Sequence, residues 1–279
     1  MKNILKIMLM MITIYTITGS AVYAAEIPVS DQDQLITSRD WTEISNLQDE
    51  MKKEEPDATI DYDKALKVYV DCNLIKLQTA DTKKLTSALE SANYVWVIPF
   101  KMEKTYGMFT VAKGLPLSEE AKSVLTKAEQ EEVKNHAGKW MITETAEHTV
   151  EPYYDILLEK REALSDCTRV VLVGSQPGMR QPVALGMDDE TARIWISLGY
   201  QYPVMEKIPE TQNVESGVYS FDSVAEISDT YIEDSEVSTG AGVQSRSSMK
   251  YVAGIGIIVI GSILILSVLK KKKLEQSGE

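Results

Sequence analysis

The sequence predicts an α+β fold, a mostly antiparallel sheet with helices on one face, joined to one C-terminal transmembrane helix. Short runs rich in β-branched and aromatic residues, typical of strands, alternate with amphipathic stretches typical of helices. Adjacent strand-like runs follow one another without regular βαβ alternation, which favours the α+β class over the α/β class. The uncharged run Tyr251–Leu269 predicts the transmembrane helix.

The predicted membrane span reads YVAGIGIIVIGSILILSVL. About 20 helical residues cross the roughly 30 Å hydrocarbon layer of a bilayer. The span is followed at once by a stop-transfer run of four lysines, and cytoplasmic flanks carry excess Lys and Arg. We therefore expect the C-terminus in the cytoplasm and the bulk of the chain outside. The alternative is a buried core helix, but such helices rarely run so long without a charge. The stop-transfer lysines are Lys270, Lys271, Lys272 and Lys273.

The N-terminus has the anatomy of a secretory signal peptide. Lys2 and Lys6 precede an apolar run, and small residues follow it. Val22 and Ala24 occupy the −3 and −1 positions of a cleavage site, so residues 1–24 are predicted to be removed. The alternative is an uncleaved anchor, which would give two spans with both termini inside.

The net charge of the outer part limits its partners. The whole chain has a formal charge of −13. Residues 25–249 hold 22 of its 29 basic residues and 40 of its 42 acidic residues, which gives −18 for the outer part. So acidic a surface disfavours nucleic acid and anionic lipid headgroups as partners. It favours cationic partners, or serves solubility alone.

The outer part divides by composition. Residues 25–60 form a polar N-terminal segment with a weak helical pattern, and its end, from Gln48 to Thr59, is predicted to be a solvated linker or helix end. Residues 61–220 are predicted to form the α+β domain. Residues 221–250, rich in Ser, Thr, Asp, Glu and Gly, predict a flexible stalk. After the span, residues 270–279 make a short cytoplasmic tail.

Within the domain, apolar patterning predicts strands and helices by position. Residues 65–71 alternate apolar and polar, so we expect a strand that turns Lys67 and Tyr69 toward water. One long helix is expected over residues 117–135, with Val124 and Leu125 on its packed face. The other expected strands are 94–100, 106–113, 139–145, 169–174, 182–186 and 191–198, and the other expected helices are 81–92 and 154–164.

The two cysteines, Cys72 and Cys167, both lie in the outer part next to predicted strands. Extracellular compartments favour disulfides. The sequence therefore predicts a Cys72–Cys167 bond, with two separate reduced thiols as the alternative.

The sequence shows no pattern that assigns a catalytic residue, a cofactor site or a metal site. Only two histidines occur, His136 and His148, and HExxH, CxxC and GxSxG motifs are all missing. Acidic pairs such as Asp31 and Asp33 lack the spacing of a calcium loop. An aromatic set is open to two interpretations, a platform for a sugar or peptide, or core packing, and the positions of Trp96 and Trp195 in predicted strands favour the core. The set consists of Trp96, Trp140, Trp195, Tyr200 and Tyr202.

These features predict a cell-surface, single-pass membrane protein that acts as a binding or interaction module, alone or as an accessory subunit of a membrane complex. Its expected partners are the bilayer, through residues 251–269, and an unknown protein or cell-envelope component. The lack of an N-glycosylation sequon fits a bacterial surface. The alternative is a membrane-tethered extracellular hydrolase that works with two carboxylates, since many glycosidases have no short signature.

Overall fold

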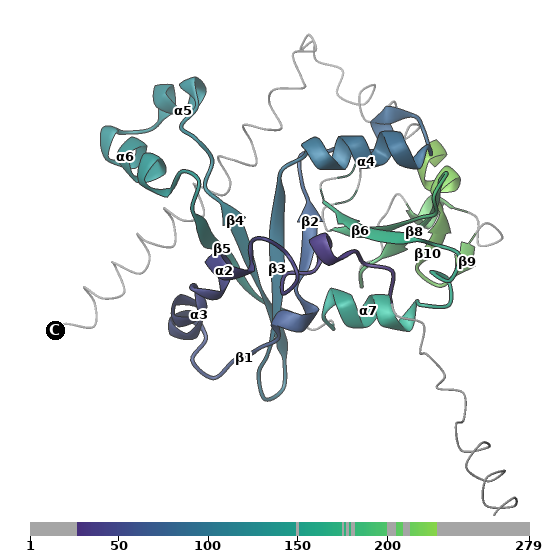
Figure 1. Cartoon of the computed structure of the whole chain (residues 1–279), viewed down its shortest axis with the longest axis horizontal. Helices are drawn as coiled ribbons and strands as arrows, with labels where there is room; N and C mark the ends of the chain where they lie inside the picture. The colour runs from purple at the N-terminus through teal and green to yellow at the C-terminus, as the bar shows by residue number, and fades with distance from the viewer. Residues whose placement is uncertain are drawn as a thin grey trace, which may run out of the picture.

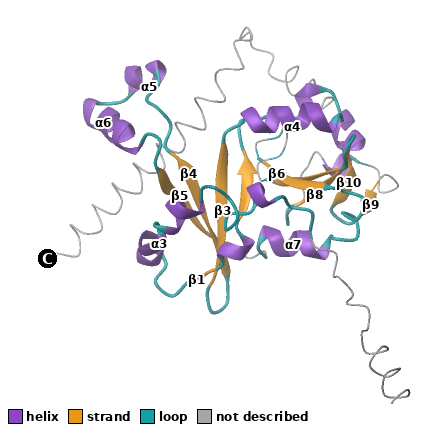
Figure 2. Ribbon diagram, viewed as in Figure 1, coloured by secondary structure: helices purple, strands orange, loops and turns teal. Residues whose placement is uncertain are grey.

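The computed structural model describes residues 27–227 except 149–150, 175, 177–178, 180–181, 200–204 and 209–212. Within that part, ten strands form one mixed sheet, accompanied by helices (Figures 1 and 2). The strands are β1 (Thr59–Ile60), β2 (Leu66–Tyr69), β3 (Tyr94–Lys101), β4 (Tyr106–Lys113), β5 (Trp140–His148), β6 (Arg169–Val173), β7 (Val183–Met187), β8 (Ala192–Ser197), β9 (Asn213–Glu215) and β10 (Val218–Ser220).

The helices of the described part are short. The α-helices are α2 (Trp41–Ser45), α3 (Gln48–Glu54), α4 (Thr82–Ser91), α5 (Glu119–Val124), α6 (Lys127–His136) and α7 (Tyr153–Glu159), and one more covers residues 221–227. The 3-10 helices are η1 (Asp31–Asp33), η2 (Tyr62–Lys64), η3 (Ile75–Leu77) and η4 (Met205–Lys207).

The sheet is built from two antiparallel halves that meet at one parallel pair. The strand order is β5-β4-β3-β2-β6-β7-β8-β10-β9, with β1 paired to the far end of β3. Only β2 and β6 run parallel among these neighbours, with Val68 opposite Leu172 and Tyr69 opposite Val173. The mostly antiparallel sheet predicted from the sequence is thus what the structure shows, with a parallel junction at its centre.

Helices cover both faces of the sheet, so the prediction that they lie on one face is wrong. Leu85 and Leu89 of α4 pack with Val171, whereas Leu157 of α7 packs with Val170. Consecutive residues of a strand point to opposite faces. Figure 1 shows α4 and α7 on the two sides of the central strands accordingly. The hydrophobic pattern of β6 is continuous because both of its faces are buried.

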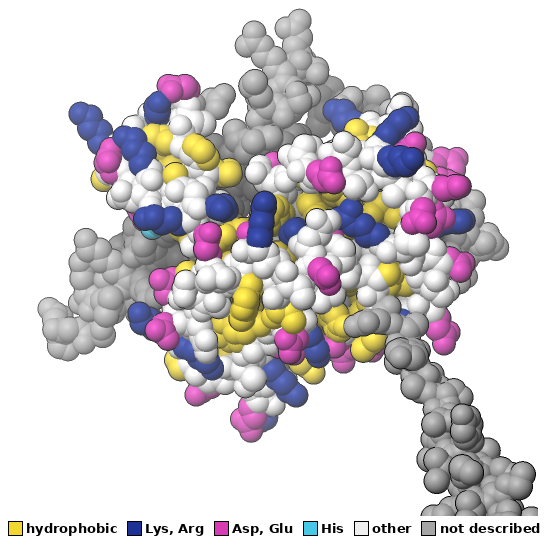
Figure 3. Space-filling model, viewed as in Figure 1, with side chains coloured by type: hydrophobic (Ala, Val, Ile, Leu, Met, Phe, Trp, Pro, Cys, Tyr) yellow, Lys and Arg dark blue, Asp and Glu magenta, His cyan; other side chains and the backbone are white. Residues whose placement is uncertain are grey.

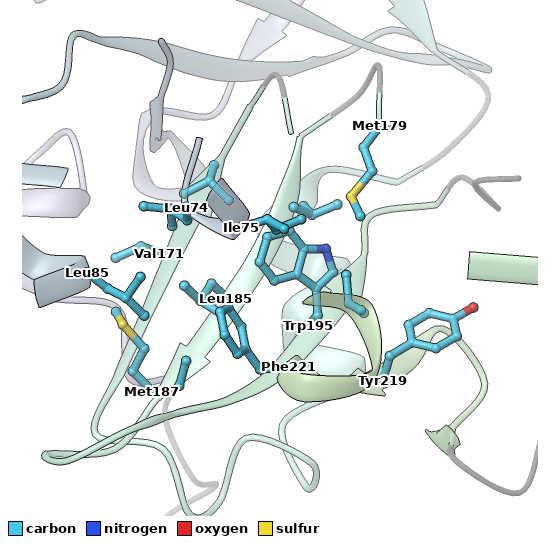
Figure 4. Packing of buried hydrophobic residues seen from close by; sticks show 14 of the residues in the cluster. Leu74, Ile75, Leu85, Val171, Met179, Leu185, Met187, Trp195, Tyr219 and Phe221 are labelled. Atoms are coloured by element: carbon cyan, nitrogen blue, oxygen red, sulfur yellow. The ribbon is translucent and has the colours of Figure 1, made fainter. Parts of the chain in front are cut away.

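The core has three apolar clusters. Trp195 is the largest side chain of the first cluster, under α4, and is fully buried (Figure 4). The second cluster fills the opposite face under α7. The third lies on the same face as the first, over β3 and β4, where the N-terminal segment covers Trp96 and Phe109. The two clusters on that face are separated by polar residues of β2.

The N-terminal segment is part of the packed domain. Of the two outcomes expected for Gln48 to Thr59, a solvated linker or a helix end, the structure shows a helix, α3. Met51 of α3 and Ile44 of α2 are completely buried, and Ala58 is buried just before β1. The polar composition of the segment gave no sign of this packing, because each short helix contributes a single apolar residue to the core while the rest of its surface is exposed to solvent. A few well-placed apolar residues were enough to dock it.

No helix in the described part of the chain is long and apolar enough to cross a membrane. The predicted signal peptide, the span Tyr251–Leu269, the four stop-transfer lysines and most of the predicted stalk lie outside the described residues.

Candidate functional site

A buried ionic cluster occupies the centre of the sheet, between the two apolar clusters of one face. Lys67 of β2 and Asp33 of η1 are both buried, with Nζ and Oδ1 3.5 Å apart. Arg169 of β6 donates from Nη2 to Asp33 Oδ2 at 2.9 Å. The hydroxyls of Tyr69 and Ser30 also donate to this carboxylate, at 2.7 and 2.6 Å. Asp33 is therefore saturated with donors.

The pKa of Asp33 reflects those donors. Burial alone would raise it, but the hydrogen bonds from Ser30 and Tyr69 and the charge of Arg169 outweigh burial, and the pKa lies below its usual value. Burial lowers the pKa of Lys67, although Asp33 opposes this change.

The pairing of these groups shows that the predicted solvent-exposed face of β2 is wrong, because η1 covers Lys67 and Tyr69.

A second carboxylate, Asp40, extends the polar cluster toward β3. Its Oδ2 accepts from the Tyr94 hydroxyl at 2.8 Å and from the Trp96 indole at 3.1 Å. The ammonium of Lys67 lies 4.7 Å from the centre of the Tyr94 ring and 5.2 Å from that of Trp96. The N-terminal segment is thus fastened to the sheet by two acids that bind side chains of β2, β3 and β6.

This ionic cluster is suited to holding the fold together rather than to turnover. Catalysis needs a group that stays free to exchange a proton or to meet a substrate. Asp33 is committed to four donors, and Lys67 and Arg169 are committed to Asp33. The cluster was missed in the sequence because a buried lysine in an alternating strand cannot be distinguished from one on a wet face.

The predicted disulfide is also not formed. Cys72 and Cys167 are free thiols in the structure. Cys72 follows β2 and packs on the α4 side, whereas Cys167 precedes the parallel strand β6 and packs on the α7 side. The two residues thus lie at opposite ends of paired strands and on opposite faces, which a disulfide cannot bridge. Burial raises the pKa of the Cys72 thiol to about 12 and that of Cys167 to about 11, so both are poor nucleophiles.

The other residues singled out in the sequence are scattered. Trp96, Trp140 and Trp195 are buried, which confirms core packing over an open platform. Asp188 caps a turn and pairs with Arg193 at 2.5 Å. His136 ends α6. Among the residues that the structure describes, no group of three or more His, Cys, Asp or Glu side chains is placed to hold a metal ion.

A helical arm projects from the sheet between β4 and β5, and we define it as residues 114–139. Its root is closed by backbone hydrogen bonds from Gly114 to the Lys139 carbonyl at 2.9 Å and from Gly138 to the Gly114 carbonyl at 2.8 Å. A Cβ on Gly114 would overlap the His136 carbonyl, and Gly138 has a φ of 75°. Both positions therefore require glycine.

The arm contains two helices where the sequence predicted one. Thr126 has an extended backbone and forms a capping box with Glu129, whose carboxylate accepts from the Thr126 backbone N–H at 2.7 Å. Gln130 donates to the carbonyls of Lys122 and Leu125, which ties α6 to the end of α5. The Thr-x-x-Glu spacing at 126–129 is a capping-box signature and was the available signal for this break.

The arm buries no side chain among those described, although it is hydrogen-bonded into a defined shape. Val124 is 68% exposed and Leu115 is 48% exposed, the two most exposed large apolar side chains of the described part. Figure 1 shows α5 and α6 standing away from the sheet, and Figure 3 shows apolar side chains at the surface there among charged ones. The face predicted to pack in the core is therefore solvent-facing.

Comparison with protein-family models, with curated proteins and with solved structures finds no match to this chain.

Proposed function

We propose that the chain is a membrane-anchored binding module, displayed on the outside of the cell, whose contact surface is the arm. The single observation that carries this proposal is the arm's combination of defined shape and exposed apolar side chains. Two caps and a closed root hold α5 and α6, yet Val124 and Leu115 remain in water. A pre-organised surface loses less conformational entropy when it binds a partner.

The chemistry of the arm favours a protein as the partner. Its sequence contains no Phe, Tyr or Trp, so it lacks the aromatic faces on which sugars stack and the ring anchors typical of membrane interfaces. Its four lysines are matched by five glutamates, so it lacks the basic surplus that nucleic acid or an anionic bilayer requires. Exposed aliphatic side chains within a polar rim are typical of a protein–protein contact.

The hydrolase alternative finds less support in the described residues. A glycosidase needs a carboxyl group whose pKa is raised so that it can act as a general acid. Hydrogen bonds instead lower the pKa values of the described carboxyl groups of Asp33, Glu129 and Asp188, which suits none of these three to act as a general acid. We therefore favour binding over hydrolysis.

The membrane topology is tested by proteolysis of intact cells that carry the full chain with a tag at each end of the mature protein. We expect added protease to remove the outer tag and the folded domain and to leave a small membrane fragment with the C-terminal tag. The basis is the signal-like N-terminus and the lysine run after Leu269. Loss of the C-terminal tag after protease treatment of intact cells would contradict this orientation.

A further inference from the structure

An aromatic and cationic row crosses the face of the sheet next to the arm, and it lies apart from the arm's exposed apolar residues. Tyr69 lies opposite Tyr94 on β2 and β3, and Lys113 lies opposite Trp140 on β4 and β5, one residue beyond the paired Val95 and Ala112. The ring centres of Tyr94 and Trp140 are 5.8 Å apart, and the Lys113 ammonium lies 5.6 Å from the centre of the Trp140 ring. Arg39 of the N-terminal segment lies next to the row, with its Nε 3.8 Å from the Asp40 carboxylate that accepts from the Tyr94 hydroxyl.

The charges around this row do not cancel. Next to the row, Lys67 and Arg169 both pair with Asp33, and Asp40 adds a second carboxylate close to Lys67. At its rim, Arg39 is 86% exposed and reaches only Asp40, at 3.8 Å, and no carboxylate of the described residues lies within ion-pair distance of Lys113. Along the row, the four cations Arg39, Lys67, Lys113 and Arg169 thus face two carboxylates, on a chain whose net charge is −13.

One hydrogen-bond donor in the row also lacks a partner. The indole Nε1 of Trp140 is buried and has no acceptor among the described residues. Buried donors are nearly always satisfied in folded proteins, so such a group calls for an acceptor that the chain does not supply. The exposed side chain of Lys113 lies over the face of this ring, and the indole N–H points outward in the ring plane.

We infer that Arg39 and Lys113 hold an anionic group, a carboxylate or a phosphate, at the edge of the Tyr94–Trp140 pair. Two cations offer charge-assisted hydrogen bonds to an oxyanion, and the positive edge of an aromatic ring, unlike its negative face, attracts one. An oxygen of the bound anion would also accept a hydrogen bond from the Trp140 indole N–H. On the outer face of a membrane, the same chemistry is found in acidic sugars and in phosphate-bearing surface polymers, and a free anion would bind alike.

The test follows the Trp140 indole by NMR in the full chain, labelled with ¹⁵N-tryptophan in detergent micelles, with the signal assigned through Trp140→Phe. We expect sodium phosphate or sodium acetate to shift this signal saturably, and sodium chloride at equal ionic strength to leave it in place. Arg39→Met and Lys113→Met should each weaken binding by about tenfold or more. Saturation at the lower concentration by phosphate or by acetate identifies the preferred group.

Lys101→Met is the matched control, because Lys101 lies 5.9 Å from the Tyr106 ring at the other end of the same hairpin and forms the same kind of pair. It should leave anion binding unchanged. An equal shift with chloride, no shift with either oxyanion, or an equal loss in Lys101→Met would overturn the inference. Circular dichroism of each variant separates lost binding from lost folding.

Discussion

Replacement of Asp33 by Asn is expected to lower the free energy of unfolding by about 3–5 kcal/mol, the usual cost of removing one partner from a buried ion pair. The substitution leaves the buried Lys67 and the half-buried Arg169 without a carboxylate in ion-pair distance among the described residues. It also weakens the attachment of the N-terminal segment that covers β2. Urea denaturation followed by circular dichroism measures the change.

Asp33→Asn also tests how the free energy of unfolding depends on pH. The pKa of Asp33 in the folded chain lies below its ordinary value, so the stability contributed by its ionised form is present at neutral pH and is lost as the pH falls through the folded pKa. The difference between wild type and Asp33→Asn should therefore narrow in acid. Asp31→Asn, an exposed neighbour in η1, serves as control and should change stability by less than about 0.5 kcal/mol. Equal losses in the two variants would show that the ionic cluster does not stabilise the fold.

Replacement of Trp195 by Ala is expected to lower the free energy of unfolding by about 3–5 kcal/mol, because it empties the centre of the first apolar cluster. Trp195 is fully buried, lies opposite Leu185 on β7 and Tyr219 on β10, and has the Phe221 ring 5.9 Å from its own. Figure 4 shows these side chains around the indole.

Trp195→Phe separates the contribution of the packed ring from that of the indole N–H. The Trp195 indole Nε1 is buried without an acceptor in the described part of the chain, so Phe removes an unsatisfied donor while keeping most of the ring. We expect Phe to cost far less than Ala in the same denaturation measurement. Equal costs for the two variants would mean that the indole N–H, and not the packed ring, is what stabilises this position.

Most elements of the fold could be predicted from hydrophobic period alone. The hairpin of β3 and β4 matches its expected strands almost residue for residue, because both strands are long and their boundaries carry turn residues. Strands buried on both faces, such as β6, were recognised by their continuous apolar runs. These signals are local, so the sequence carries them without reference to the rest of the chain.

What could not be predicted depends on contacts between distant segments. Lys67 is buried only because Asp33, more than thirty residues earlier, folds over it. Cys72 and Cys167 sit next to adjacent strands but at opposite ends, because β2 and β6 turned out to be parallel. Val124 was assigned to the core because its helical period is correct, although the helix that carries it has no core to face.

The arm as a contact surface is tested most directly by a photo-crosslinking amino acid placed at Val124 in the full chain and activated in intact cells. The matched control is Glu103, an exposed residue in the turn between β3 and β4. The proposed function predicts a discrete cross-linked protein adduct at position 124 that is missing at position 103. It also predicts that protease added outside the cell digests this adduct. Identical products at both positions, or no protein adduct at position 124, would contradict the proposal.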